Sequence, residues 1–214
     1  MFSADAANGL FNRPDLFRRY DETDDEQFYA YPRLVVHIDE AAVAATTALY
    51  RDLLPPHGVI LDLMSSWRSH LPPDVPYRRV AGLGMNAVEL RENPQLTDYI
   101  VQNLNKNPLL PYDAATFDGC VITVSVQCLT DPVAVFRDVG RVLRPGAPFI
   151  VVFSNRMFPT KAVAVWQALD DRGHGRLIQA YYEETGLFAN VQVLDRSLRG
   201  HDPLYAVVGF RTTT

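Results

Sequence analysis

Short, unbroken apolar runs alternate with helix-like segments from Gly58 to near the C-terminus. The first run, Val59–Leu63, consists of four aliphatic residues and one acid, Asp62. Runs this short and continuous are typical of strands that are buried on both faces. We therefore expect strands at 59–63, 80–83, 99–104, 120–126 and 149–153, with helices at 87–92 and 133–143.

The flanking segments complete this pattern. Apolar spacing predicts a helix over 38–54, with Asp39 and Glu40 in its first turn, and further helices at 161–169 and 175–184. Segments 191–194 and 205–210 are expected to pair as a terminal hairpin. The alternation predicts an α/β fold, a Rossmann-like three-layer sandwich. Its sheet would have seven mostly parallel strands and an antiparallel terminal hairpin.

Length and composition narrow the possible functions. We expect a single domain over 1–214, with an N-terminal helical segment in 1–54 and the Rossmann-like core in 55–214. A formal net charge of -5 argues against nucleic acid as a partner. No apolar run approaches the roughly 18 residues of a membrane span, so we expect a cytoplasmic protein with no membrane partner. The sequence does not indicate an oligomeric state.

The histidines and cysteines indicate neither a metal site nor a disulfide. The five histidines and two cysteines lack the spacing of known metal-ligand motifs. Cys120 and Cys128 would bracket one strand, and at roughly 3.3 Å per residue they would lie too far apart to bond.

In sheets of this type, ligands bind beyond the carboxyl ends of the strands, where the strand order reverses. This rule selects the residues that follow each expected strand. They are Asp62–Trp67, Gly82–Asn86, Asn103–Asn105, Ser125–Cys128 and Ser154–Phe158.

Two motifs carry a family resemblance over roughly residues 55–214. Leu110-Pro111 with Phe117-Asp118, and then Arg141-Val142-Leu143-Arg144-Pro145-Gly146, resemble the second half of class I S-adenosylmethionine-dependent methyltransferases. The resemblance implies S-adenosyl-L-methionine as cofactor and methyl transfer to a small-molecule acceptor. Two alternatives remain open: a non-catalytic binding module with this fold, and a cofactor-dependent enzyme of another reaction type, such as cyclisation.

The cofactor site implied by the resemblance departs from the family pattern in three places. Met64-Ser65-Ser66-Trp67 stands where a glycine-rich loop usually follows strand one, Gly84 replaces the ribose-binding acid after strand two, and Asn103 replaces the acid after strand three. Asp62 keeps the acid of strand one and is expected to orient the cofactor ammonium. The full set of expected cofactor residues is Asp62, Met64, Ser65, Ser66, Trp67, Gly82, Gly84, Met85, Asn86, Asn103, Leu104, Asn105, Ser125, Val126 and Gln127.

The resemblance also implies that the N-terminal segment folds over the site as a helical lid, with the acceptor bound beneath it. Its aromatic rings, guanidinium and imidazole suit a polar or anionic acceptor, although these side chains equally suit a lid that packs on the core. His37 is the candidate base, needed only if the acceptor loses a proton. The expected acceptor-binding residues are Tyr29, Tyr31, Arg33, His37, Asn155 and Arg156.

Overall fold

The computed structural model describes residues 9–213 and contains one seven-stranded sheet. The strands are ordered β3-β2-β1-β4-β5-β7-β6. β1 to β5 are parallel, whereas β7 runs antiparallel to both β5 and β6. The strand bounds are β1 Val59–Leu63, β2 Arg79–Gly84, β3 Asp98–Val101, β4 Gly119–Thr123, β5 Pro148–Phe153, β6 Phe188–Asp195 and β7 Tyr205–Arg211. The predicted fold class is confirmed.

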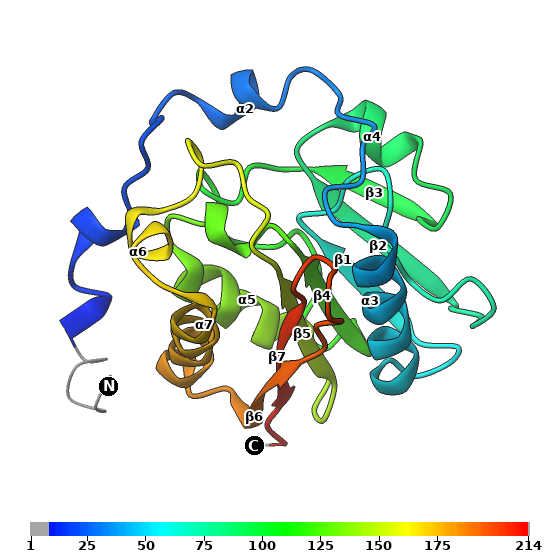
Figure 1. The fold of residues 1–214 in the computed structure, drawn as a ribbon. Coiled ribbons are helices and arrows are strands. Elements are labelled where there is room, and N and C mark those ends of the chain that lie inside the picture. The colour runs from blue at the N-terminus through cyan, green and yellow to red at the C-terminus, as the bar shows by residue number, and fades with distance from the viewer. Residues whose placement is uncertain (1–8, 214) are drawn as a thin grey trace.

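Helices cover the sheet on both faces (Figure 1). The helices are α2 Asp25–Phe28, α3 Glu40–Leu53, α4 Ala87–Arg91, α5 Pro132–Val142, α6 Ala164–Gln167 and α7 Asp171–Thr185, with 3-10 turns η1 Pro14–Phe17 and η2 Val126–Cys128. Aspartates cap the three longest helices: Asp39, Asp131 and Asp170 each accept a hydrogen bond from a first-turn backbone N–H. Such caps satisfy backbone donors that have no partner within a helix.

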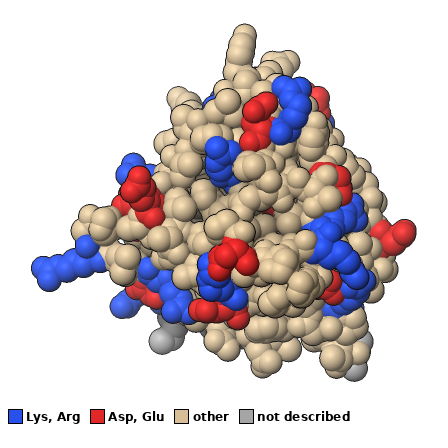
Figure 2. All heavy atoms as spheres, turned by 90° about the vertical axis from the view of Figure 1, so that its right-hand side faces the viewer, with Lys and Arg blue, Asp and Glu red and all other residues tan. Residues whose placement is uncertain are grey.

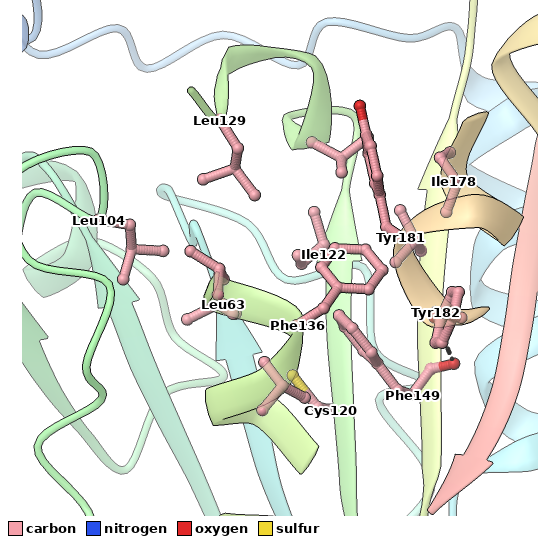
Figure 3. Packing of buried hydrophobic residues seen from close by; sticks show 14 of the residues in the cluster. Leu63, Leu104, Cys120, Ile122, Leu129, Phe136, Phe149, Ile178, Tyr181 and Tyr182 are labelled. Atoms are coloured by element: carbon pink, nitrogen blue, oxygen red, sulfur yellow. Dashed lines mark hydrogen bonds between the residues drawn. The ribbon is translucent and has the colours of Figure 1, made fainter. Parts of the chain in front are cut away.

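The sheet separates two apolar clusters. On one face, Phe136 of α5 and Tyr182 of α7 pack on Phe149 of β5, and Tyr181 packs on Phe136 (Figure 3). Tyr182 also donates a hydrogen bond of 3.0 Å to the Phe149 carbonyl oxygen. On the other face, the buried side of α3, including Leu49 and Tyr50, packs on β1, β2, β4 and β5. The strands are therefore buried on both faces, as their apolar runs predict.

Residues 18–38, which we call the strap, cross the carboxyl ends of the parallel strands before α3 begins (Figure 1). The strap contains one helical turn, α2, and is otherwise irregular. Arg19 forms an isolated β-bridge with Val163, and the Asp21 N–H donates to the Thr160 carbonyl at 2.9 Å. The strap is thus hydrogen-bonded to the segment that follows β5.

One predicted helix is much shorter than expected. The spacing predicts a helix over 161–169, but the structure has only Ala164–Gln167 there. Lys161 and Ala162 precede it in non-helical backbone, and Val163 is held extended by its bridge to Arg19. The tertiary pairing with the strap therefore overrides the local helical pattern.

Two predicted strands are also shorter than expected. The third ends at Val101 rather than Leu104. The fourth ends at Thr123 rather than Val126, because Val124 takes a left-handed conformation with φ 52°. Cys120 and Cys128 are both free and buried. None of the helices within residues 9–213 has the length and hydropathy of a membrane span.

Candidate functional site

A pocket of about 360 Å³ lies beneath the strap at the carboxyl ends of β1, β2, β3 and β4. β1 lies between β2 and β4. The strand order therefore reverses at β1, with β2 and β3 on one side of it and β4 and β5 on the other. This is the switch point where ligands bind in open α/β sheets. The volume is within the usual range for small-molecule sites.

Most of the predicted site residues line this one pocket. The predicted cofactor residues that do so are Asp62, Met64, Ser65, Ser66, Trp67, Gly84, Met85, Asn86, Asn103, Leu104, Asn105, Ser125 and Gln127. The predicted acceptor residues that do so are Tyr29, Arg33, His37 and Arg156.

Four predicted residues lie away from the pocket wall. Gly82 lies within β2 and is covered by Leu96, whose Cδ1 would be 2.5 Å from an added Cβ. Val126 is 1% exposed and packs in the core. Tyr31 is 80% exposed, and Asn155 is also exposed. Their positions in the sequence are near the site, but their side chains do not contribute to it.

The turn after β1 is built around Asp62. Asp62 is 2% exposed and accepts a hydrogen bond of 2.5 Å from the Ser65 hydroxyl. Met64 takes a left-handed conformation with φ 56°, which is uncommon for a residue with a side chain. The backbone therefore makes the turn that glycine usually makes, and it does so without glycine.

Burial raises the pKa of Asp62 to about 6, because desolvation of the carboxylate outweighs its hydrogen bonds with serine. Among residues 9–213, no cationic side chain acts on this carboxylate, whose only hydrogen-bonding partners are Ser65 and Ser69. A buried acid of this kind suits a ligand that brings its own positive charge.

Gly84 is required by close contact with the β1 turn. The Ser65 N–H donates to the Leu83 carbonyl at 2.8 Å, which brings the turn against the end of β2. A Cβ on residue 84 would overlap the Ser65 carbonyl oxygen. The acid expected from the family pattern therefore has no room at this position.

A carboxylate that was not predicted from the sequence lies in the first turn of α4, the helix that follows β2. Glu89 of α4 is 8% exposed and lines the pocket. It accepts hydrogen bonds from the Ser66 hydroxyl at 2.7 Å and from the Arg33 backbone N–H at 2.6 Å. The signal was its position as the acid in the first turn of the helix predicted after the second strand.

Asn86 has a structural role in the observed geometry. Its side-chain oxygen caps α4 by accepting from the Val88 and Glu89 N–H groups. Its amide nitrogen donates to the Tyr29 and Ala30 carbonyls of the strap. The side chain is fully engaged, so Glu89 is the better candidate for a polar contact with a ligand at the end of β2.

The end of β4 presents two buried polar atoms that lack partners in residues 9–213. They are the Ser125 hydroxyl oxygen and the Gln127 side-chain oxygen, and both residues line the pocket. Unpaired buried polar atoms are rare in proteins and require an explanation. Polar atoms of a bound ligand would satisfy both. Val124, which precedes them with φ 52°, is strained in a way that is often found at functional sites.

The asparagines after β3 divide between two roles. Asn105 donates to Asp25 and to the Cys128 carbonyl and accepts from Thr130, so it is fully engaged in the structure. Asn103 accepts from the Asn105 N–H and lines the pocket. Of the two, Asn103 is the better placed for a ligand.

The mouth of the pocket is formed by the strap and by the segment after β5. His37 is exposed there and its ring contacts Phe158 edge-on, with centroids 5.2 Å apart. Partial burial lowers the pKa of His37. The negative charge of Glu89 acts in the opposite direction, and the positive charge of Arg33 lowers the pKa further. Trp67 donates from its indole nitrogen to the Val35 carbonyl at 2.8 Å. The tryptophan thus anchors the strap at the mouth.

Several other residues line the pocket, of which Met157 and Phe158 lie in the segment 154–158 that the strand-end rule selects, whereas the others were not predicted. They belong to the strap, the β1 turn or the segment after β5, and the main ones are Asp25, Val35, Val36, Ile38, Arg68, His70, Met157 and Phe158. Residues 9–213 contain no group of three or more His, Cys, Asp or Glu side chains suited to holding a metal ion. Acidic and basic side chains are interspersed on the face shown in Figure 2.

Comparison with known proteins supports the fold and one family. Residues 79–151 match the family model described as a methyltransferase domain. A structure of an S-adenosylmethionine-dependent methyltransferase from Mesorhizobium loti is 18% identical, with a TM-score of 0.56, and the match covers 78% of this chain and 98% of that one. No curated protein sequence matches this chain significantly.

Two further structures show the range of proteins with this fold. An S-adenosylmethionine-dependent methyltransferase from Thermotoga maritima, described as a possible histamine N-methyltransferase, is 13% identical with a TM-score of 0.59, covering 80% of this chain and 90% of that one. The [4+2]-cyclase SpnF is 12% identical with a TM-score of 0.57, covering 79% and 80%. At these identities the likeness concerns the fold.

Proposed function

We propose, from the place of this chain in the class I S-adenosylmethionine-dependent methyltransferase superfamily, that it binds S-adenosyl-L-methionine in the pocket and transfers the methyl group to a small molecule. The observation that carries the proposal is Asp62. It is a buried carboxylate at the switch point that pairs with no cationic side chain of residues 9–213, and its pKa is raised to about 6. The ammonium group of the cofactor would complete it.

The remaining polar groups fit the other parts of the cofactor. Glu89 offers carboxylate oxygens near the end of β2 for the ribose hydroxyls, in place of the missing acid at Gly84. Ser125 and Gln127 offer a hydroxyl and a carbonyl oxygen that lack partners in the described chain. Asn103 offers an amide for the adenine edge.

When bound, the cofactor supplies a methyl group on a positively charged sulfur, which is a good leaving group. The chain contributes proximity and the exclusion of water, because the strap covers the strand ends. In-line placement of an acceptor can lower a barrier by several kcal/mol. His37 is the candidate base at the mouth, since its lowered pKa leaves the imidazole neutral near pH 7.

Direct binding of the cofactor tests the proposal. At about 100 times its dissociation constant, S-adenosylmethionine or its demethylated product should add roughly 2.7 kcal/mol of stability. For a chain of this size, this corresponds to a rise in Tm of about 5–10 °C. Differential scanning fluorimetry and calorimetric titration measure both quantities. The absence of heat and of any change in Tm at millimolar ligand would favour a non-catalytic module.

Glu89→Gln tests the assignment at the end of β2. Charge-assisted hydrogen bonds are worth roughly 1.5–3 kcal/mol, so we expect cofactor affinity to fall by about tenfold or more. The matched control is Glu92→Gln, at the exposed C-terminal cap of the same helix, which should leave the affinity unchanged. Equal affinities for the two variants would remove Glu89 from the site.

A further inference from the structure

Two arginines at the pocket carry charges that no acidic side chain neutralises. Arg33 belongs to the strap, Arg68 follows the turn after β1, and both line the pocket. Among residues 9–213, no carboxylate forms an ion pair with either guanidinium. A third arginine of the pocket lining, Arg156, is different, because it pairs with Asp202 at 2.7 Å.

Arg33 is oriented by aromatic rings and backbone carbonyls. Its guanidinium lies over the rings of Phe28, Tyr29 and Phe158, at 4.6, 5.6 and 5.4 Å from their centroids. It donates to the Phe28 carbonyl at 2.9 Å and to the Tyr31 carbonyl at 3.4 Å. These contacts fix the direction of the group but leave part of its fork of N–H donors available.

Arg68 is oriented in a similar way. Its guanidinium lies 3.8 Å from the centroid of the Trp67 ring, and its Nη1 donates to the Trp67 and Glu92 carbonyls at 2.7 and 3.3 Å. The Trp67 indole donates to the Val35 carbonyl of the strap at 2.8 Å. This bond ties the segment that carries Arg68 to the strap two residues from Arg33.

The acidic side chains of the pocket lining are directed elsewhere. Asp25 pairs with Arg19 at 2.7 Å. Glu89 accepts from the backbone N–H of Arg33 at 2.6 Å, and not from its guanidinium. Asp62 is 2% exposed at the end of β1, and no cationic side chain of the described residues acts on it. The negative charge that the two arginines lack can therefore come from a ligand.

Two histidines add hydrogen-bond donors at the same pocket. His37 and His70 line it, and neither imidazole forms a hydrogen bond with another residue in the described part of the chain. Burial lowers the pKa of His70, and the charge of Arg68 lowers it further. Burial also lowers the pKa of His37, on which Glu89 and Arg33 act in opposite directions. A neutral imidazole has one N–H that can donate to an anionic oxygen.

Apolar side chains form the outer part of the pocket. Val35, Val36 and Met157 line it, although they are 54%, 43% and 39% exposed. Burial of such side chains against an apolar part of a ligand is favourable. They suit an uncharged aliphatic body beside an anionic group.

We infer that the acceptor carries an anionic oxygen group, a carboxylate or a phosphate, on an aliphatic body, and that Arg33 and Arg68 recognise this group. The inference rests on the proposed function and names the substrate class of the same site. A guanidinium is always charged, and its planar fork matches the oxygens of both groups. Arg68, which was not predicted as a site residue, joins Arg33 in this role.

Four matched probes test the inference. They are hexanoate, hexyl phosphate, hexanamide and hexylamine, which have the same number of carbon atoms and differ in the head group. Binding of the demethylated cofactor is measured first by calorimetry, and its failure would overturn the proposed function. Each probe is then titrated into the full-length protein saturated with that cofactor, at one ionic strength, because salt screens exposed charges.

We expect the better of the two anions to bind about tenfold more tightly than the amide and the amine, because charge-assisted hydrogen bonds are stronger than neutral ones. The better anion distinguishes a carboxylate acceptor from a phosphate acceptor. Cofactor binding together with equal or tighter binding of hexanamide or hexylamine, or with no binding of either anion, would overturn the inference.

Arg33→Gln and Arg68→Gln test the two recognition residues. Each should weaken the better anion by about tenfold and leave hexanamide unchanged, because only the anion loses a charge-assisted partner. A strap displaced by the loss of Arg33 would weaken the amide and the anion alike. Arg176→Gln removes the same charge at an exposed residue of α7 that does not line the pocket, and it should alter neither.

Two results with these variants would contradict the inference. In the first, both arginine variants bind the anions as tightly as the unmodified protein does. In the second, the variants lose affinity for the cofactor but not for the added anion, which would assign the guanidiniums to the carboxylate of the cofactor itself.

Discussion

Asp62→Asn is expected to make the cofactor-free protein more stable at pH 7. The pKa of Asp62 is raised from 3.8 to about 6. Raising a pKa by one corresponds to about 1.4 kcal/mol of free energy, so ionisation of the buried carboxyl at pH 7 costs up to about 3 kcal/mol. Asparagine has no charge to bury and can still accept from Ser65. Allowing for its extra N–H donors, we expect a gain of about 1–2 kcal/mol in urea unfolding.

The pH dependence of this gain has a definite sign. The folded-state pKa lies above the unfolded value, so the unfolded chain ionises first as pH rises. The contribution of the protonated Asp62 carboxyl to the free energy of unfolding is fully present below about pH 4, and it is lost as the pH rises from about 4 to about 6. The stability difference between Asp62→Asn and the unmodified protein should therefore be small at pH 4 and level off above pH 6.

The same substitution should abolish tight cofactor binding. The carboxylate is expected to pair with the cofactor ammonium, and its removal should weaken affinity by at least tenfold. In the unmodified protein, affinity should fall by about tenfold per pH unit below pH 6, whereas Asp62→Asn should show no such dependence. Calorimetric titration between pH 5 and 8 measures this.

Asp52→Asn, an exposed change on α3, is the control for both effects. Unchanged affinity in Asp62→Asn would show that Asp62 is a turn residue only.

Asp25→Ala is expected to destabilise the protein by about 3–5 kcal/mol. Asp25 is 5% exposed and is the common partner of Arg19 and Lys161, of which Lys161 has no exposed surface. Burial alone would raise its pKa, but hydrogen bonds from Arg19 and Asn105 hold the pKa below its ordinary value. Removing the carboxylate leaves two buried cations without their main counter-charge, which is strongly unfavourable.

Urea unfolding at pH 7 measures the effect of Asp25→Ala. The control is Glu26→Ala, in the same helical turn, which removes an exposed ion pair with Lys106 and should change stability by less than about 1 kcal/mol. Since the pKa of Asp25 is lowered on folding, its contribution is present above about pH 4 and is lost as pH falls. A loss no larger than that of Glu26→Ala would show that the strap is held by other contacts.

The sheet could be predicted from sequence because its strands are buried on both faces. In β1, β4 and β5 nearly every side chain must be apolar, so the pattern alone locates them. The helix predicted at 161–169 is confined to Ala164–Gln167 for a non-local reason. Val163 is held extended by Arg19, and no local pattern contains that pairing.

The site was predictable in position but not in detail. Asp62, Ser65 and Gln127 follow strands that end at one edge of the sheet, and topology brings them together. The role of Glu89 depends on the path of the strap, because one of its two partners is the Arg33 N–H. The unpaired oxygens of Ser125 and Gln127 are visible only once every neighbour is placed.

The contact between Ser65 and Gly84 means that the turn after β1 and the end of β2 constrain each other's sequence. A carboxylate at residue 84 would need the turn at 64–66 to follow a different path, because the Ser65 carbonyl fills the space of its Cβ. Restoring the family acid alone should therefore damage the site, whereas restoring it with a glycine-rich turn would not meet this obstacle. For this chain, the absence of an acid at residue 84 follows from the path of the glycine-free turn at 64–66 and is not a separate departure.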